Sequence, residues 1–348
     1  MENLEVDLAG CSYRISFGPQ VWEQVKTWAA RYDRVLLVTD TNVEKLYGKR
    51  LPFPRAVLEP GEENKSMAFA QAVLEKMCQE GLSRDSLVIA LGGGVIGDLA
   101  GFCAAIYQRG LAYLQIPTTL VAQVDSSIGG KTALNTSWGK NLIGAFHQPK
   151  GVFIDPAVLK TLPASEIING LGEIFKYGII GDPPLFSAVQ KNLTAFFNAD
   201  IEVMAPLIRR CCALKSAIVS KDEKDQGARR ILNYGHTLGH ALEALTAFQA
   251  YSHGEAVLIG MLYEASLALE LGLLSPDSYQ KIKTGLQQIE LDWDLSFLDL
   301  GDLVQALLKD KKNRRGLISF LLPRRLGEME EVLLSPEKFR ESWVKLEL

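Results

Sequence analysis

Residues 86–98, SLVIALGGGVIGD, decide the fold. Residues 86–91 form a short apolar run typical of a buried strand, and glycines occupy positions 92–94 and 97 directly after it. Such glycines let a phosphate group approach the backbone where a strand ends, and the helix that follows offers N–H donors in its first turn. The same pattern is typical of a tight turn that only packs a helix onto a sheet. The stretch therefore predicts a strand, a turn and a helix, and it leaves both interpretations of the turn open.

The next strand does not complete the usual dinucleotide-binding pattern. That pattern has an acidic residue about 20 residues after the glycines, at the end of the second strand, where it binds the ribose. Here the second strand ends in Gln115-Ile116-Pro117, whereas an acid, Asp40, ends the apolar run 34–40 upstream. We therefore expect a nucleotide to bind in an arrangement that differs from the common one.

A second phosphate-binding pattern is incomplete. Residues 125–132 read DSSIGGKT, but Asp125 stands where the phosphate-binding loop of an NTPase needs its first glycine. This argues against an NTPase. Lys131, Lys140 and Asn141 remain as donors suited to a phosphate or a carboxylate, although a surface loop would be the simpler explanation of this segment alone.

Strands and helices alternate in the first part of the chain, and helices dominate the second. This order predicts a parallel sheet with helices on both faces, followed by a helical region. The expected strands are 34–40, 86–91, 112–117 and 151–155, with one late strand at 317–322. The expected helices are 66–80, 165–180, 201–221, 231–246, 255–271 and 277–289. We therefore expect an α/β nucleotide-binding domain over residues 1–155 and a mainly α-helical domain over 156–348, with a cleft between them that is a favoured place for a ligand.

The composition is that of a folded protein without a nucleic-acid partner. The 348 residues carry a net charge of −4 and 47% of them are hydrophobic, whereas a nucleic-acid binder shows a basic excess. Five cysteines, an odd number without a CxxC pair, indicate a reducing compartment. The acidic start of the chain does not look like a signal peptide, and Asp98 interrupts the long apolar stretch 87–107. We expect a cytoplasmic protein with neither a membrane nor a nucleic acid as partner.

Histidine is rare in the chain, yet three of its four histidines fall within 18 residues. His236 and His240 are four residues apart, on one face of a helix, and His253 begins the next helical run. A single histidine on a helix is usually structural, but three gathered in this way indicate a metal site or a catalytic site. The spacing does not decide which of them are ligands, nor which carboxylate joins them. The candidate carboxylates are Glu173, Asp222, Glu223, Glu243 and Glu255.

Taken together and in order, the motifs resemble the 3-dehydroquinate synthase family over essentially the whole chain. Each motif is weak alone, and the ordered set is specific. The motifs are GGGVIGD at 92–98, PTTL at 117–120, DSSIGGKT at 125–132, Lys140-Asn141, GEIFKYG at 172–178, Asp222-Glu223, Arg229, LNYGHTLGH at 232–240 and HGEA at 253–256. The resemblance implies that the helical domain over 156–348 binds metal and substrate, with the active site in the cleft between the two domains. It also implies a homodimer with tightly bound NAD and a divalent metal, usually zinc, with cobalt as the alternative.

The resemblance also implies roles for individual residues. Glu173, His236 and His253 match the metal ligands, so that His240 lies beside the substrate in a proton-relay or hydrogen-bonding role. The positions implied to contact substrate or to act in catalysis are Asp125, Lys131, Asn141, Lys176, Lys215, Arg229, Asn233, His240, Lys311 and Lys312, the last two near the phosphate. The positions implied to contact NAD are Asp40, Asn42, Glu62, Lys65, Gly93, Gly94, Val95, Asp98, Thr118, Thr119, Asp125, Lys140, Thr161 and Leu162.

The implied reaction converts 3-deoxy-D-arabino-heptulosonate 7-phosphate to 3-dehydroquinate and phosphate, a step of the shikimate pathway. It runs through transient oxidation by NAD, elimination of phosphate, reduction, ring opening and intramolecular aldol closure, which makes it a lyase reaction without net redox change. The sequence departs from the family at Asp225, where glutamate is usual. The charge is kept but the side chain is shorter, which leaves open whether the family's ion pair forms here.

Other functions fit parts of the pattern. A sister cyclase acting on sedoheptulose 7-phosphate or glucose 6-phosphate would share the first domain, but Lys215, Arg229 and Asn233 favour a substrate that carries both a carboxylate and a phosphate. A metal-dependent alcohol or glycerol-phosphate dehydrogenase has a similar two-domain plan and would release reduced cofactor. A non-catalytic NAD-binding protein is disfavoured by the complete ligand set and the many cations suited to phosphate.

Overall fold

The computed structural model describes residues 3–247, 249–309 and 316–346. Two compact units make up the chain: Met1–Leu162 with Asn198–Asp225, called here the α/β unit, and Pro163–Phe197 with Gln226–Leu348, called the helical unit. In the described part of the chain, no helix is both long enough and apolar enough to cross a membrane. Lys311 and Lys312 lie outside the described residues.

The division differs from the expected boundary after residue 155. Helix α8 (Ile201–Lys221), which helical period alone assigned to the second domain, packs against strand β1 (Leu4–Val6) and the turn η4 (Ala122–Ser126). Both of these belong to the first unit. Periodicity shows that a segment is helical, but it carries no information on which neighbours bury its apolar face.

The α/β unit is built on a seven-stranded sheet in the order β1-β2-β9-β6-β5-β3-β4. β1 and β2 are antiparallel, and every other neighbouring pair is parallel. The strands are β1, β2 (Tyr13–Phe17), β3 (Val35–Asp40), β4 (Arg55–Leu58), β5 (Leu87–Gly92), β6 (Ala112–Pro117) and β9 (Gly151–Ile154). The four expected strands of this region are therefore confirmed as β3, β5, β6 and β9.

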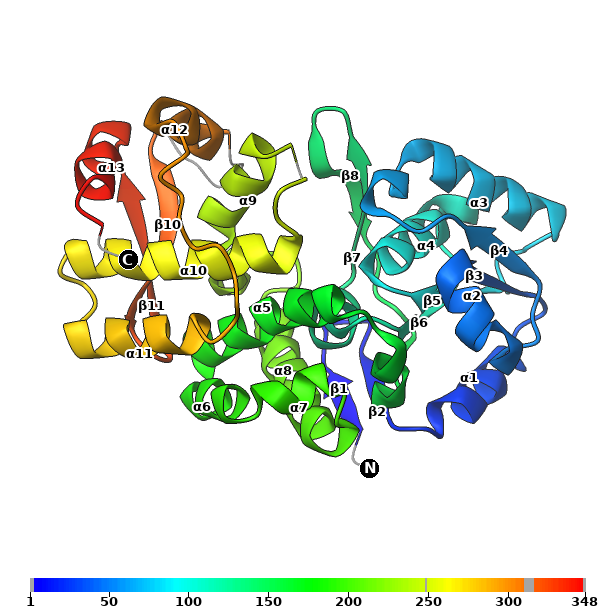
Figure 1. The fold of residues 1–348 in the computed structure, drawn as a ribbon. Helices are drawn as coiled ribbons and strands as arrows, with labels where there is room; N and C mark the ends of the chain where they lie inside the picture. The colour runs from blue at the N-terminus through cyan, green and yellow to red at the C-terminus, as the bar shows by residue number, and fades with distance from the viewer. Residues whose placement is uncertain (1–2, 248, 310–315, 347–348) are drawn as a thin grey trace. The chain divides into compact units, whose positions relative to one another are not determined.

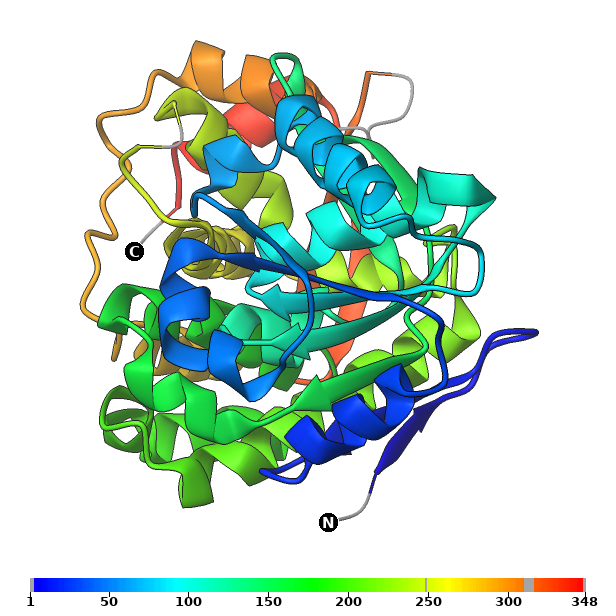
Figure 2. The same ribbon diagram turned by 90° about the vertical axis from the view of Figure 1, so that its right-hand side faces the viewer.

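Helices cover both faces of this sheet because its central strands are apolar on both sides. In β5, Leu87, Ile89 and Leu91 pack with helix α1, whereas Val88 and Ala90 pack with helices α3 and α4 on the other face. Figures 1 and 2 show the dark-blue α1 and the light-blue α3 on opposite sides of the strands. The remaining elements of the unit are α1 (Val21–Ala29), α2 (Thr41–Tyr47), α3 (Met67–Gln79), α4 (Gly94–Ile106), η1 (Gly48–Arg50), η2 (Glu62–Asn64), η3 (Tyr107–Arg109), η4, η5 (Pro156–Thr161), α8 and the hairpin of β7 (Lys131–Thr136) and β8 (Gly139–Phe146).

The strand order reverses between β3 and β5. From β3 the chain moves outward to β4 and then returns to β5, on the other side of β3, before continuing to β6 and β9. In open α/β sheets, ligands bind outside the carboxyl ends of the strands at such a reversal. Here those ends are Asp40 and the glycines after Leu91.

The helical unit centres on α10 (His253–Glu270), most of which is buried between α5, α9 and β10. The helix expected over 231–246 is two elements, η6 (Ala228–Asn233) and α9 (His236–Leu245), because Gly235 adopts a left-handed conformation with φ of 77°. The other elements are α5 (Ala164–Gly181), α6 (Pro183–Lys191), α7 (Leu193–Phe197), α11 (Pro276–Leu286), α12 (Leu300–Leu308), β10 (Ile318–Arg325), β11 (Glu328–Leu334) and α13 (Pro336–Trp343). The expected late strand is confirmed as β10, which pairs antiparallel with β11.

Candidate functional site

Three side chains of the helical unit converge on one point. Glu173 lies in the middle of α5, while His236 and His253 are the first residues of α9 and α10. One ligand atom from each lies within 4.8 Å of the other two. Glu173 Oε1 is 3.4 Å from Nε2 of both histidines. One carboxylate and two imidazoles form a donor set that suits a divalent metal such as zinc.

Glycines allow α5 and α10 to meet backbone to backbone beside this point. A Cβ on Gly172 would lie 2.8 Å from the Gly254 carbonyl oxygen, and a Cβ on Gly254 would lie 2.3 Å from Asn169 Cα. Asn169 Oδ1 also accepts a hydrogen bond from the Gly254 amide, at 2.9 Å. The crossing places Glu173, which follows Gly172 on α5, next to His253, which precedes Gly254 on α10.

The second ring nitrogen of each ligand histidine faces an oxygen acceptor. His236 Nδ1 lies 3.0 Å from the Tyr234 carbonyl, which assigns its proton to Nδ1 and leaves Nε2 as the electron-pair donor. His253 Nδ1 lies 3.6 Å from Oε1 of the buried Glu243. An acceptor behind each imidazole is the arrangement that orients histidine ligands in metal sites. The residues present therefore fit a bound divalent metal.

The surroundings of the cluster lower the pKa values of Glu173 and His236 and raise that of His253. Burial alone would raise the pKa of Glu173, but the Lys176 ammonium and the two histidines hold it well below its usual value. Burial, followed by the charge of Lys176, lowers the pKa of His236. Burial also acts to lower the pKa of His253, yet its contacts with Glu173 and Glu243 outweigh this and raise that pKa to about 9.

Zinc binding at pH 7 is expected to release a proton from His253. With a pKa of about 9 the metal-free imidazole holds that proton at neutral pH, and only the neutral ring is a ligand. Raising the pH toward 9 removes the competing proton, so the apparent affinity should rise by up to about tenfold per pH unit. Calorimetric titrations in two buffers of different ionisation enthalpy measure the release. A pH-independent affinity with no proton released would contradict the expectation.

His240 lies next to the cluster but does not join its ligand set. Its ring centroid is 5.4 Å from that of His236 and 6.3 Å from that of His253, and its side chain is exposed. Among the described residues, the group able to hold a metal is Glu173, His236 and His253. The position agrees with the expected role of His240 beside a substrate.

The positions matched to NAD gather at one edge of the α/β unit. They follow the carboxyl ends of five adjacent parallel strands, and they include the reversal between β3 and β5. After β3 these are Asp40 and Asn42; after β4, Glu62 and Lys65; after β5, Gly93, Gly94, Val95 and Asp98; after β6, Thr118, Thr119, Asp125 and, on β8, Lys140; after β9, Thr161 and Leu162.

The glycine turn after β5 packs α4 onto the sheet, and its geometry is compatible with phosphate binding. A Cβ on Gly97 would lie 2.6 Å from Gln115 Oε1 on β6, so this glycine lets α4 pack close to the sheet. A side chain at Gly93 would collide with Thr119, because its Cβ would lie only 2.8 Å from Thr119 Cγ2. Helix α4 begins at Gly94, and its N-cap residue, Gly93, has no side chain to bond the first amides. The turn thus offers backbone donors of the kind that bind phosphates.

A buried lysine connects three of the matched positions. Lys65 Nζ lies 2.5 Å from Asp98 Oδ2 on α4 and donates a hydrogen bond to Asn141 Oδ1 on β8, at 2.6 Å. Lys65 is 5% exposed. Asp40 is also buried, and its Oδ1 accepts from the amides of Asn42 and Val43 at the start of α2.

Two further cations of the α/β unit pair with acids. Lys131 Nζ lies 2.5 Å from Asp225 Oδ2, so an ion pair forms despite the shorter aspartate side chain. Lys215, on α8, contacts Asp125 through both the carboxylate, at 2.8 Å, and the backbone carbonyl, at 2.7 Å. The Lys131 side chain is 51% exposed, whereas that of Lys215 is 5% exposed.

The structure brings expected residues together within each unit. In the α/β unit they form three separate contacts: Lys65 with Asp98 and Asn141, Lys215 with Asp125, and Lys131 with Asp225. In the helical unit, Glu173, Lys176, His236, His240 and His253 lie together, and Arg229 and Asn233 lie on η6. Sequence reasoning overlooked two residues whose side chains accept hydrogen bonds from backbone amides beside the histidines. Asn169 stands four residues before Glu173 on the same helix face, and Glu264 is an acid inside the apolar run of α10. Both positions are visible in the sequence as polar residues on otherwise apolar helix faces.

Comparison with known proteins agrees with this geometry. The family described as 3-dehydroquinate synthase N-terminal matches residues 55–169, and the one described as 3-dehydroquinate synthase C-terminal matches residues 170–313. A 3-dehydroquinate synthase of Alkaliphilus metalliredigens is 48% identical over 345 residues, which is 97% of each chain. The chain belongs to the 3-dehydroquinate synthase family.

Solved structures of related cyclases share the fold over nearly the full length. A 2-epi-5-epi-valiolone synthase from Streptomyces hygroscopicus, solved with NAD+ and Zn2+, superposes with a TM-score of 0.88 at 27% identity and 98% coverage of both chains. A 2-deoxy-scyllo-inosose synthase, solved with carbaglucose-6-phosphate, NAD+ and Co2+, gives a TM-score of 0.86 at 25% identity, covering 99% of this chain and 100% of the other. The expected α/β and helical architecture is confirmed by these likenesses.

Proposed function

We propose that this protein converts 3-deoxy-D-arabino-heptulosonate 7-phosphate to 3-dehydroquinate and phosphate, with NAD and a divalent metal as cofactors. The observation that carries the proposal is the convergence of Glu173, His236 and His253 in a chain whose whole length matches the family. Related cyclases with NAD and zinc or cobalt support the cofactors. When bound, the metal would polarise a substrate oxygen and NAD would take up and return a hydride.

The chain's own residues supply the metal ligands and the charges around the substrate. Glu173, His236 and His253 would hold the metal, and Lys176 fixes the ionised state of Glu173. His240, exposed and beside both ligand rings, can hold or pass a proton at a ring nitrogen. The cyclisation itself needs mainly a substrate held in one conformer.

Several of the expected substrate positions hold cations or amides, which suit a substrate that carries a phosphate and a carboxylate. Lys131 and Lys215 in the α/β unit, with Arg229 and Asn233 in the helical unit, match the substrate positions of the family. Asn141 and Lys176 match it as well, and Lys311 and Lys312 do so outside the described residues. Asp225 holds the Lys131 side chain in place until an anionic group of the substrate replaces the aspartate.

Replacing Lys131 with alanine is expected to impair substrate binding and to leave stability nearly unchanged. The side chain is 51% exposed, and exposed ion pairs contribute at most about 1 kcal/mol to folding. Loss of a charged contact to a phosphate or carboxylate should raise KM roughly tenfold to a hundredfold. Steady-state kinetics and thermal melting test this together. A destabilised variant that still binds substrate normally would assign Lys131 to the fold instead.

Phosphate release tests the proposed reaction directly. Purified protein is supplied with 3-deoxy-D-arabino-heptulosonate 7-phosphate, NAD and zinc, while free phosphate, the organic product and absorbance at about 340 nm, the band of the reduced nicotinamide, are followed. Release of phosphate with 3-dehydroquinate formed and without accumulation of NADH is the expected result. Turnover of sedoheptulose 7-phosphate or glucose 6-phosphate instead would make the protein a sister cyclase. Steady production of NADH would make it a dehydrogenase.

We also propose a homodimer in the cytoplasm. The family resemblance supports the dimer, as does an apolar surface on the β7–β8 hairpin, where Trp138 is 91% exposed and Phe146 is 46% exposed. The odd cysteine count supports a reducing compartment. Sedimentation of the purified protein distinguishes a dimer from a monomer.

A further inference from the structure

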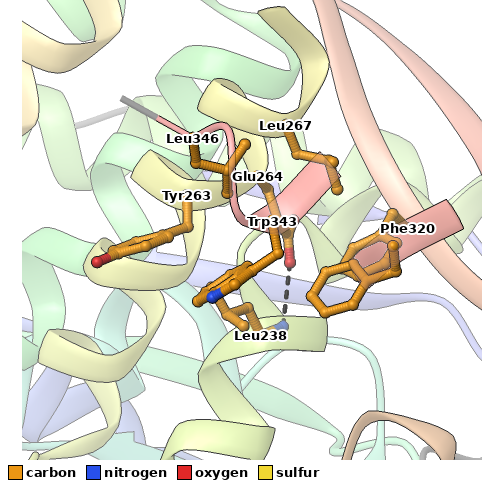
Figure 3. A pocket seen from close by; sticks show the side chains of 8 residues that line it. Leu238, Tyr263, Glu264, Leu267, Phe320, Trp343 and Leu346 are labelled. Carbon is orange, nitrogen blue, oxygen red and sulfur yellow. Dashed lines mark hydrogen bonds between the residues drawn. The ribbon is translucent and has the colours of Figure 1, made fainter. Parts of the chain in front are cut away.

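Glu264 is a buried carboxylate whose hydrogen bonds go to the start of another helix. It lies in α10 and is 1% exposed. Its Oε2 accepts from the Gly235 amide at 2.7 Å, and its Oε1 accepts from the Leu238 amide at 3.1 Å. Figure 3 shows the carboxylate directed at Leu238, with the bond drawn as a dashed line. Both oxygens thus bond the first turn of α9.

The surroundings of Glu264 are apolar. The small void beside it is lined by Leu238, Tyr263, Leu267, Phe320, Phe339, Trp343 and Leu346 (Figure 3). A carboxylate in such a place is costly unless its charge is compensated. The amides of α9 and the positive end of its helix dipole provide that compensation. The carboxylate therefore has a strong preference for this one position of α9.

Helix α9 cannot obtain these bonds from its own N-cap. The N-cap residue is Gly235, which has no side chain and lies in a left-handed conformation. A Cβ on Gly260 would lie 2.0 Å from the Gly235 carbonyl oxygen, so the end of α9 rests directly on α10. Glu264 is one helical turn further along α10 and replaces the missing cap.

The two amides that Glu264 holds lie on either side of His236. His236 is the first residue of α9, directly after Gly235 and two residues before Leu238. Its side chain points to Glu173 through Nε2 and to the Tyr234 carbonyl through Nδ1. A carboxylate that fixes the backbone before and after this residue also fixes where its ring stands.

We propose that Glu264 is a positioning residue for the metal site, which it serves by fixing the first turn of α9 and hence the ring of His236. The inference rests on the proposed function, because it takes His236 as a metal ligand. Glu264 does not contact the metal position itself; it acts through two backbone amides. Asn169 of α5 makes a similar contact beside His253: its Oδ1 accepts a hydrogen bond from the amide of Gly254, the residue after His253.

Glu264→Gln tests the inference with little change of shape. One carboxylate oxygen becomes an NH₂ group that faces an N–H donor, so one bond is lost and the charge at the helix end disappears. The metal-free protein is titrated with zinc against a chromophoric chelator, and the visible spectrum of the Co²⁺-loaded protein is recorded. We expect zinc affinity to fall about tenfold to a hundredfold, the range for outer partners of metal ligands, and the cobalt bands to shift.

Ser275→Ala is the matched control. Ser275 caps α11 through a hydrogen bond from the Ser278 amide, and α11 carries none of the proposed site residues. This variant should melt a few degrees lower, as expected for a lost cap. Its zinc affinity and cobalt spectrum should equal those of the unmodified protein. The comparison separates loss of a cap from loss of a metal-site support.

The possible results separate a failure of the inference about Glu264 from a failure of the proposed metal site. If Glu264→Gln binds zinc within about twofold of the unmodified protein with an unchanged cobalt spectrum, Glu264 is not a positioning residue. If His236→Ala also leaves the affinity unchanged, the metal assignment itself is wrong. If Glu264→Gln does not fold, Glu264→Asp decides in the same way, since it keeps the charge but withdraws it from the two amides.

Discussion

Replacing His253 with alanine is expected to lower zinc affinity by more than about a hundredfold and to abolish metal-dependent turnover. Loss of an outer partner of a metal ligand already costs about tenfold to a hundredfold, and loss of a direct ligand costs more. The variant leaves Glu173 and His236, and two protein ligands hold zinc far less tightly than three. Metal content after dialysis, measured by elemental analysis, tests the expectation. Undiminished zinc in His253→Ala would contradict it.

Two other histidines serve as controls for this experiment. His147 stacks on Tyr113 in the α/β unit and its Nε2 lies 2.8 Å from the Leu111 carbonyl, so His147→Ala should keep its zinc. His240→Ala should also keep its zinc but lose turnover, since His240 lies beside the ligand set without belonging to it. Zinc loss in His240→Ala equal to that in His253→Ala would move His240 into the ligand set.

Replacing Asp98 with alanine is expected to lower the free energy of unfolding of the cofactor-free protein by about 3–5 kcal/mol. Removal of one partner from a buried ion pair leaves the other charge without compensation, which is among the costliest single changes in a protein. The Lys65 and Asp98 side chains are 6% and 16% exposed, and their charged atoms lie 2.5 Å apart. Burial acts to lower the pKa of Lys65, but Asp98 and Glu62 together outweigh it and raise that pKa. Burial raises the pKa of Asp98 even though Lys65 acts to lower it, which shows that burial of this pair is costly to both charges.

A double variant provides the control for Asp98→Ala. Lys65→Met together with Asp98→Ala removes both charges and should restore most of the lost stability, because no charge remains buried. Urea unfolding of the single and double variants, without NAD or metal, measures the difference. Equal stability of Asp98→Ala and the unmodified protein would show that the pair contributes nothing to folding.

The sequence predicted the central strands of the seven-stranded sheet, but it missed the outer strands β1, β2 and β4 and most of the two small sheets β7–β8 and β10–β11. β3, β5, β6 and β9 are buried on both faces and therefore appear as continuous apolar runs. β11 reads EMEEVLL and has only its last residue buried, so its sequence resembles a surface segment. The β7–β8 hairpin was also missed, because β8 exposes apolar and polar residues alike.

The histidine cluster was predicted as a site, but its carboxylate was not predictable from spacing. Glu173 is far from the histidines along the chain, and only the crossing at Gly172 and Gly254 brings it close. Glu255, which is nearer in sequence, instead bonds the Ser252 amide and hydroxyl at the start of α10. The family resemblance, not the residue pattern, singled out Glu173.

The discontinuity of the α/β unit has a consequence for folding during synthesis. The first stretch of the unit ends at Leu162, but α8, which packs on β1 and η4, is translated only after the first helices of the helical unit. The α/β unit is therefore complete only when residues 198–225 have been translated, after residues 163–197 of the helical unit. A nascent chain that ends near residue 162 lacks α8 and therefore exposes the surface of β1 and η4 that α8 later covers, and exposed apolar surface of this kind promotes aggregation.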